Sequence, residues 1–472
     1  MVFNTLVFAV FFVVVFSTYW MLRHSLRMQN LLLFVASSFF YGWWDWRFLF
    51  LMYFTIVLDF LVGLGLERQS DQRKRRLLLI LSVTANLTVL GFFKYFNFFI
   101  ESATELLHVL GMDPHPVVLR IVLPVGVSFY TFQSISFVVD VYHRELKAPR
   151  SLLNYAAYVS LFPQLVAGPI ERAKHLLPQV LQKRTLTLDK FYEGSYLIFW
   201  GLFKKVFIAD NLARIVDPIF ATGYQASGAE VVVATYAFAF QIYADFSGYT
   251  DIARGTAKLL GFELMLNFNL PYFATNPSDF WRRWHISLSS WLRDYLYKSL
   301  GGNRKGNVRT YVNLILTMLL GGLWHGARWN FVLWGAYQGG LLAVHRAAKP
   351  LLERLDSRLP ERVMRPLYIL VFFQFVCFGW LLFRAESFGQ ISQFTAAMFA
   401  GIDFSVVAGY LPKLIVYISP LLIMQFFQYR TGNLNVLLSS PLVVRVVFYV
   451  LVFFAMMSLG NLSASQFIYF QF

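Results

Sequence analysis

The chain has 472 residues, of which 58% are hydrophobic, 19% aromatic and only 14% charged. Soluble domains carry about a quarter charged residues, so this composition excludes an ordinary soluble protein and indicates a polytopic membrane protein. The apolar runs are continuous rather than alternating, which favours spanning helices over membrane strands. Lys and Arg in cytoplasmic loops and near lipid head groups account for the net charge of +16, so we expect membrane lipids and no nucleic acid as partners.

Apolar runs long enough to cross a bilayer recur along the chain. The first run has no basic segment before it and no small-residue cleavage site, so we interpret it as a retained span and not as a signal peptide. The predicted spans are 1–22, 29–46, 49–66, 77–93, 117–141, 152–170, 191–209, 229–247, 309–325, 329–346, 364–383, 410–427 and 442–460. We expect one integral-membrane domain, with N-terminal spans in 1–115, a catalytic core in 116–346 and scaffold spans in 347–472.

Charged loops between the spans predict the orientation. A dense basic loop before the fourth predicted span is expected on the cytoplasmic side, because Lys and Arg are enriched in cytoplasmic loops. Its basic residues are Arg68, Arg73, Lys74, Arg75 and Arg76. Counting back through three spans places the N-terminus on the periplasmic side. A second charged stretch, 347–365, is predicted to be a solvated loop. The single cysteine, Cys377, excludes an internal disulfide and a cysteine metal cluster.

Polar residues interrupt the middle of the chain at membrane depth. Segments 121–142 and 158–172 contain Gly, Pro, Gln and acidic residues, which membrane segments tolerate only where they are buried in protein or line a wet cavity. Asp245, Ser247 and Tyr249 lie at the end of another predicted span. We interpret these three as candidate substrate-binding residues, and the alternative is a polar turn at the water interface.

The stretch 276–334 is the longest that does not resemble a plain membrane span. A Pro-Ser-Asp start signal and apolar residues at helical spacing as far as Tyr295 predict one amphipathic helix. Its basic residues lie largely off the apolar face, so we expect the helix in the membrane interface with its cations among head groups. They include Arg282, Arg283 and Arg293. A glycine-rich break that contains Asn303 separates this helix from a true span.

His325 ends that span and is the leading candidate for catalysis. It lies between Trp324 and Gly326 after an apolar run, where poor solvation favours the neutral imidazole that a general base needs. We expect Gly321, Gly322 and Gly326 to leave room beside it for a slender substrate. The alternative is a satisfied core or interfacial histidine. Six other histidines lie in or beside polar or basic loops: His24, His108, His115, His143, His175 and His345.

His285 lies on the aromatic face of the predicted amphipathic helix, where packing is a competing explanation. The spacing of its neighbours does not support a metal site. Basic and aromatic residues nearby suit either a clamp for a phosphorylated or polyanionic substrate, with a groove for sugar stacking, or contacts with lipid phosphates and an aromatic belt. Besides the three residues near 247, the candidate substrate- or donor-binding residues are Trp284, Arg282, Arg283, Arg293, Trp324 and Asn303.

Several longer segments carry a family resemblance. They are LPVGVSFYTFQSISFVVDVY from residue 123, FPQLVAGPIER from 162, YADFSGYTDIARG from 243, FWRRWHISLSSWLRDYLYKSLGGNR from 280 and LTMLLGGLWHGARWNFVLWGAYQG from 316. These segments resemble the membrane-bound O-acyltransferase family, and within it the branch that contains the membrane subunit of alginate O-acetylation. The resemblance extends in order over most of the chain and leaves only the region after about residue 390 without a distinctive motif.

The resemblance implies an all-α polytopic fold, with about 11–13 tilted transmembrane and interfacial helices in a ring around a thinned centre. It places the family's invariant histidine on His325 and a second, more variable position on His285. The implied reaction is acyl transfer from a thioester, here acetyl-CoA on the cytoplasmic side, to a hydroxyl, with no permanently bound cofactor. His325 would accept the hydroxyl proton, and His285 or a neighbouring donor would steady the oxyanion or bind the acceptor.

The same branch implies a location and partners. The chain is expected in a bacterial inner membrane, where it passes acetyl groups to periplasmic acetyltransferase subunits that modify a secreted polysaccharide such as alginate or cellulose. One alternative is a D-alanyl transferase of the same superfamily, which acts on teichoic acid from a carrier-protein thioester. Broken helices also suit a transporter or flippase for polymer or lipid-linked sugar, and a further alternative is a scaffold for a synthase complex.

Overall fold

The computed structural model describes residues 1–114, 118–119, 121–356, 360–461 and 467–468. Over these residues the chain forms helices and loops and no β-strand. His115, part of the start of the span expected at 117–141 and part of the loop expected at 347–365 lie outside the described residues. The chain divides into two compact units, Met1–Tyr196 with Ala253–Met265 and Leu197–Ile252 with Leu266–Phe472.

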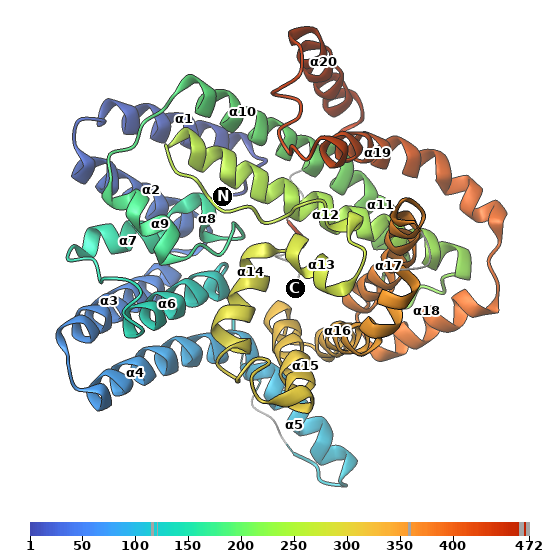
Figure 1. Cartoon of the computed structure of the whole chain (residues 1–472), viewed down its shortest axis with the longest axis horizontal. Coiled ribbons are helices and arrows are strands. Elements are labelled where there is room, and N and C mark those ends of the chain that lie inside the picture. Colours follow the sequence, from blue (N-terminus) through green and yellow to red (C-terminus); the bar gives the residue numbers. More distant parts are fainter. Residues whose placement is uncertain (115–117, 120, 357–359, 462–466, 469–472) are drawn as a thin grey trace. The chain divides into compact units, whose positions relative to one another are not determined.

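The first unit contains the N-terminal helices (Figure 1). They are α1 (Leu6–Met21), α2 (Leu26–Asp45), α3 (Arg47–Arg68), α4 (Gln72–Leu90), the π-helical turn η1 (Gly91–Tyr95), α5 (Phe96–Val109), α6 (Val127–Tyr142), α7 (Leu152–Ser160), α8 (Phe162–Leu165) and α9 (Ala173–Leu181). Several begin where a Ser, Thr or Asp side chain accepts a hydrogen bond from the first turn, as these residue types do at helix starts. The capping residues are Thr5, Ser25, Asp71 and Ser151.

Helices α3, α4 and α6 pack against one another in this unit (Figure 1). Arg75, at the start of α4, is buried and donates to the carbonyl oxygens of Val141 and Tyr142 at the end of α6. The charge pattern predicted that Arg75 belongs to a basic loop. The structure places it in a helix, where it is buried. The span expected at 152–170 is also broken. Helix α7 ends at Ser160, Leu161 leaves the helical conformation, and α8 is only one turn long, with Pro163 in its first turn.

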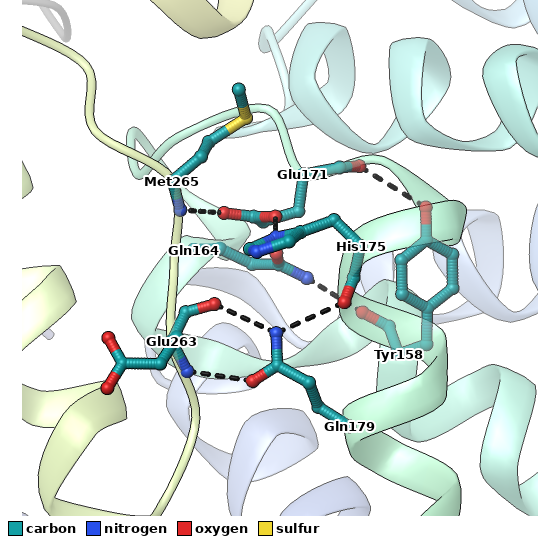
Figure 2. Close-up of polar contacts among 7 residues, drawn as sticks. All are labelled: Tyr158, Gln164, Glu171, His175, Gln179, Glu263 and Met265. Atoms are coloured by element: carbon teal, nitrogen blue, oxygen red, sulfur yellow. Dashed lines mark hydrogen bonds and ion pairs between the residues drawn. The ribbon is translucent and has the colours of Figure 1, made fainter.

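Side chains of α9 and of the loop before it hold the segment that follows α12 (Gly228–Leu259), as Figure 2 shows. Buried Glu171 accepts a hydrogen bond from Met265 N at 2.5 Å and contacts His175 Nδ1 at 2.7 Å. Gln179 makes two hydrogen bonds, of 2.8 and 3.0 Å, to the backbone of Glu263. His175 lies in the first turn of α9, beside the polar loop that precedes this helix, and its pKa is raised by the hydrogen bond to Glu171.

The second unit contains the helices that follow. They are η2 (Lys204–Ala209), α11 (Asp210–Ile219), η3 (Pro271–Phe273), α13 (Pro277–Arg283), α14 (Ile286–Trp291), η4 (Leu292–Tyr297), α15 (Gly306–His325), α16 (Trp329–Asp356), α17 (Glu361–Arg384), α18 (Phe388–Ala400), α19 (Phe404–Thr431) and α20 (Leu442–Leu459). Two helices contribute residues to both units, α12 and α10 (Leu188–Phe203).

Five helical stretches among the described residues are long and apolar enough to cross a bilayer. They are Arg47–Arg68, Gln72–Val109, Glu361–Arg384, Phe404–Thr431 and Leu442–Leu459. Many large apolar side chains on these stretches are exposed in the isolated chain, including Phe426 and Phe454. An exposed apolar surface of this extent is expected of helices whose solvent is lipid. The chain is an all-α membrane protein.

The single amphipathic helix predicted for the stretch after 276 is wrong. Asn276, one residue before the predicted start signal, caps α13, and α13 ends at Arg283. A new helix, α14, begins at Ile286. Between them His285 has a φ of +43°, in the left-handed region that residues other than glycine rarely adopt. Apolar periodicity continues across this break, so the pattern alone did not reveal it.

Helices α15 and α16 form a tight hairpin through their glycines. A Cβ at Gly322 would lie 2.2 Å from the Phe331 carbonyl oxygen, and one at Gly335 would lie 2.4 Å from the Met318 carbonyl oxygen. At Gly326 the added atom would lie 2.2 Å from the Phe331 ring. Small residues allow such close backbone approach between membrane helices. The expectation that Gly322 and Gly326 leave open room for substrate is therefore wrong, because α16 occupies the space.

Helix α16 also runs further than predicted. It continues through most of the charged stretch after 347 to Asp356, and α17 begins at Glu361. The segment LLERLD keeps leucines at helical spacing, and Lys349 forms an i,i+4 ion pair with Glu353 at 3.6 Å. The high charge of this stretch marks a solvated helix end and not a loop.

Candidate active site

The two singled-out histidines lie beside each other in the second unit. His325 is the last residue of α15, and His285 occupies the break between α13 and α14. Their ring centroids are 6.4 Å apart. Both side chains are buried, with His285 0% and His325 8% exposed. Two residues that are 40 positions apart in the sequence are thus close enough to act on one substrate.

Aromatic rings enclose this histidine pair. The His325 ring lies 5.1 Å from that of Trp334 and 5.4 Å from that of Phe383, centroid to centroid. The His285 ring lies 4.8 Å from the Phe246 ring of α12 and 6.0 Å from the Trp324 ring. His285 is outside the five spanning stretches, and its burial lowers its pKa to about 3. Its imidazole is therefore neutral at physiological pH.

Asn267 holds His285 from a segment that lies before η3. Asn267 Oδ1 is 3.1 Å from His285 Nδ1, and it accepts hydrogen bonds from Ser287 N at 3.2 Å and Ser287 Oγ at 2.9 Å. The Asn267 carbonyl oxygen accepts from Ile286 N at 2.9 Å. Helix starts leave backbone N–H groups without intrahelical partners, and Asn267 satisfies two of those of α14. This explains why a new helix begins directly after His285.

The basic and aromatic residues predicted to bind substrate or donor differ in burial and in their partners. Trp284 is buried, with its ring 4.6 Å from that of Trp380. Arg283 is ion-paired with Asp279 at 2.8 Å, and exposed Arg293 is ion-paired with Asp294 at 3.0 Å. Two further candidates, Arg282 and Asn303, are exposed.

Asp245, Ser247 and Tyr249 lie inside α12 and are buried, so a polar turn at the water interface is excluded. Lys205 Nζ lies 2.8 Å from Asp245 and 2.9 Å from Asp210. Two neighbouring contacts belong to the same cluster, Lys204 Nζ with Ser247 Oγ at 3.0 Å and the Tyr249 ring with that of Phe467. Opposite charges and hydrogen bonds compensate for the desolvation of these groups. Asp245 and Ser247 thus belong to a buried polar cluster with Lys205 and Lys204, and Tyr249 packs against Phe467; all three lie on the same helix as Phe246, which contacts His285.

Sequence reasoning did not single out Asn267, Trp334 or Phe383. Asn267 carries a weak signal, because it is an amide between Leu266 and Phe268 in an apolar loop. Trp334 and Phe383 looked like ordinary membrane-span aromatics. Among the described residues, His, Cys, Asp and Glu do not gather in groups of three or more that could hold a metal ion.

Comparison with known proteins identifies the family of this chain. Residues 144–384, just over half of the chain and including both histidines, match the profile of MBOAT, the membrane-bound O-acyltransferase family. The chain is also 46% identical over 411 residues to the probable alginate O-acetylase AlgI of Azotobacter vinelandii, which covers 86% of this chain and 79% of that protein. The chain belongs to the membrane-bound O-acyltransferase family.

More distant members act on other polymers, as their names state. The peptidoglycan O-acetyltransferase of Helicobacter pylori is 37% identical over 417 residues, which cover 82% of this chain and 77% of that protein. The teichoic acid D-alanyltransferase of Bacillus subtilis is 27% identical over 289 residues, 58% of this chain and 72% of that protein. The family resemblance drawn from the motifs is confirmed, and this membrane protein is an O-acyltransferase.

Proposed function

We propose that this O-acyltransferase takes acetyl groups from acetyl-CoA at the cytoplasmic face of the inner membrane. It passes them across the membrane for O-acetylation of a secreted exopolysaccharide such as alginate or cellulose. The names of the relatives at 46% and 37% identity support an acetyl group as the cargo. The observation that carries the chemistry is the buried pair of His285 and His325, 6.4 Å apart and enclosed by aromatic rings.

In the proposed reaction, neutral His325 accepts the proton of the acceptor hydroxyl as the hydroxyl oxygen attacks the acetyl carbonyl carbon. The tetrahedral oxyanion collapses, the carbon–sulfur bond breaks and the thiolate leaves. The imidazolium of His325 returns the proton to the thiolate, so the products are an acetyl ester and free coenzyme A. The aromatic enclosure keeps bulk water from competing with the acceptor.

The proposal includes periplasmic partners. Acetylation of a secreted polymer takes place outside the cytoplasm, whereas acetyl-CoA is made inside, so a further acetyltransferase subunit is needed on the periplasmic side. The periplasmic N-terminus expected from the charge pattern agrees with this arrangement, because it leaves the 69–71 connection on the donor side.

The test measures acetyl transfer by purified protein in liposomes supplied with radiolabelled acetyl-CoA and the periplasmic partner. We expect His325→Ala to lower release of free coenzyme at least about 100-fold, the usual contribution of a general base. His345→Ala, a histidine on α16 outside the site, is the matched control and should retain wild-type turnover.

Other results would point elsewhere. Turnover with a D-alanyl carrier protein but not with acetyl-CoA would replace the donor, in line with the relative from Bacillus subtilis. Equal turnover by wild type and His325→Ala would contradict the assignment of the base. In cells, loss of polymer secretion by His325→Ala with unchanged acetyl content per sugar would favour a transporter.

A further inference from the structure

The amide of Asn267 has only one orientation that fits its surroundings. The hydrogen-bond network shows which end of an Asn amide is the oxygen and which the nitrogen. The backbone N–H of Ser287 is a fixed donor, and it lies 3.2 Å from the atom assigned as Oδ1. A flipped amide would place an NH2 group against this N–H, donor against donor. The acceptor oxygen therefore faces Ser287 and His285.

This orientation determines the tautomer of His285. Oδ1 lies 3.1 Å from His285 Nδ1, and two atoms that only accept would repel each other at this distance. Nδ1 must therefore carry the proton. The Ser287 hydroxyl does not offer an alternative, because it lies 2.9 Å from Asn267 Oδ1 but 3.5 Å from His285 Nδ1. A neutral imidazole with Nδ1–H has its lone pair on Nε2.

We propose that Asn267 is a positioning residue of the acyl transfer, which holds His285 as the Nδ1–H tautomer so that its Nε2 is a hydrogen-bond acceptor, in a ring whose centroid lies 6.4 Å from that of His325. The inference rests on the proposed function for its link to acetyl transfer. It narrows the role of His285. With Nε2 unprotonated, His285 accepts a hydrogen bond from the acceptor hydroxyl and helps to orient it, and it does not donate to the oxyanion.

The backbone at His285 agrees with a held side chain. Its φ of +43° is strained for a residue with a Cβ. The Asn267 side chain offsets this strain through its three contacts with His285 and Ser287, beside the backbone hydrogen bond from Ile286 N. The same side chain thus holds both the strained backbone and the imidazole, so its removal is expected to release both.

Two substitutions separate positioning from folding. Asn267→Leu keeps the volume but removes the acceptor, and we expect activity to fall about 10- to 100-fold. Asn267→Asp keeps an acceptor for Nδ1–H and for the start of α14. Because Asn267 Nδ2 has no hydrogen-bond partner among the described residues, a second oxygen breaks no described bond. Asn269, an exposed residue two positions later, provides matched controls as Asn269→Leu and Asn269→Asp.

The pH profile gives a readout that a purely structural role would not move. A carboxylate beside Nδ1–H favours the imidazolium and raises the pKa of His285 from its low wild-type value. Protonated Nε2 can no longer accept, so activity of Asn267→Asp is lost as the pH falls through the raised pKa. We expect the acidic limb of the profile to move up by about one pH unit or more. The Asn269 variants should keep the wild-type profile.

The tautomer itself is measured without any activity assay. Wild-type protein labelled with 15N-histidine in liposomes is compared with His285→Gln, and the difference identifies the two His285 nitrogens. We expect a protonated Nδ1 and an unprotonated Nε2 from about pH 5 to pH 8, since the pKa lies well below this range.

Each outcome has a defined meaning. A protonated Nε2 in the wild type would overturn the inference, as would an unchanged profile together with full activity in both Asn267 variants. If the wild type has the Nδ1–H tautomer but does not consume acetyl-CoA, the assignment for Asn267 stands and the proposed donor is wrong. Misfolding of Asn267→Leu leaves the tautomer measurement and the Asn267→Asp profile as the deciding results.

Discussion

His285 and His325 show how burial and a single neighbour determine what an imidazole can do. The burial of His285 removes the charged form, and Asn267 then decides which nitrogen keeps the proton. His325 receives its surroundings from different elements, with Trp334 on α16 and Phe383 on α17. The two histidines thereby have different partners, which suits the different roles proposed for them, His325 as the base and His285 as the residue that orients the acceptor hydroxyl.

Trp334 has an indole N–H that the fold leaves unused. The side chain is 1% exposed, and its Nε1 has no hydrogen-bond partner among the described residues. A buried donor without a partner costs about 1–3 kcal/mol, so a site that develops an oxyanion is a reasonable place to retain one. We predict that Trp334→Phe lowers kcat about tenfold with little change in KM, while the melting temperature falls by only a few degrees.

The control for this prediction is Trp380→Phe, which removes a comparable buried ring whose centroid lies 6.2 Å from that of Trp334. It should cost stability without the selective loss in kcat. A rise in KM with unchanged kcat for Trp334→Phe would show that the ring only packs the site.

At the scale of elements, the α15–α16 hairpin holds His325 in place through backbone contact. Gly322 of α15 and Gly335 of α16 bring the two helices so close that neither position has space for a methyl group. His325 is the last residue of α15, three positions beyond Gly322, so the packing of the hairpin determines where the imidazole lies. A small displacement of reacting groups is enough to cost a large part of the rate.

Gly335→Ala is therefore expected to damage the site. Its Cβ would lie 2.4 Å from the Met318 carbonyl oxygen, so the helices must separate, at a cost of about 1–3 kcal/mol. We predict a lower melting temperature in detergent and a loss of acetyl transfer. Gly340→Ala on the same helix is the matched control, because no atom lies within 4 Å of its added Cβ. Ala favours helix over Gly, so this control should be neutral or slightly stabilising; equal effects of both substitutions would contradict the packing argument.

For the whole molecule, the distribution of charge predicts the orientation in the membrane. Helix α3 is long and apolar enough to cross the bilayer between Arg47 and Arg68, so we expect its two ends on opposite sides. Exposed basic residues gather at the second end, in Arg68, Arg73, Lys74 and Arg76. Positively charged loops are retained in the cytoplasm, which is the basis for placing this end inside.

The single cysteine makes this orientation testable. In a Cys377→Ser background, Ser70→Cys places a thiol on an exposed residue of the basic end, and Arg47→Cys places one at the other end. We predict that a membrane-impermeant maleimide labels Ser70→Cys in inside-out vesicles and Arg47→Cys in right-side-out spheroplasts. The opposite pattern would reverse the orientation and with it the proposed side of the donor.

Local sequence patterns were sufficient for several features of this protein. Continuous apolar runs and few charges predicted an all-helical membrane protein, and the end of the helix at His325 was located correctly. The family was recognisable because its motifs extend over consecutive residues, and the comparisons confirm it. Hydropathy and short motifs depend only on residues that are neighbours in the sequence, so they can be recognised without the structure.

Other features were decided only by the tertiary structure. The break at His285 follows from capping of α14 by Asn267, which lies 18 positions earlier and satisfies its N–H groups. The glycines near His325 serve packing against α16, and Asp245 is buried because Lys205 neutralises it. These outcomes depend on which side chain of a distant segment arrives at a given backbone group or charge. The spacing of nearby residues does not reveal such long-range contacts. The geometry of the histidine pair is therefore seen only in the folded chain.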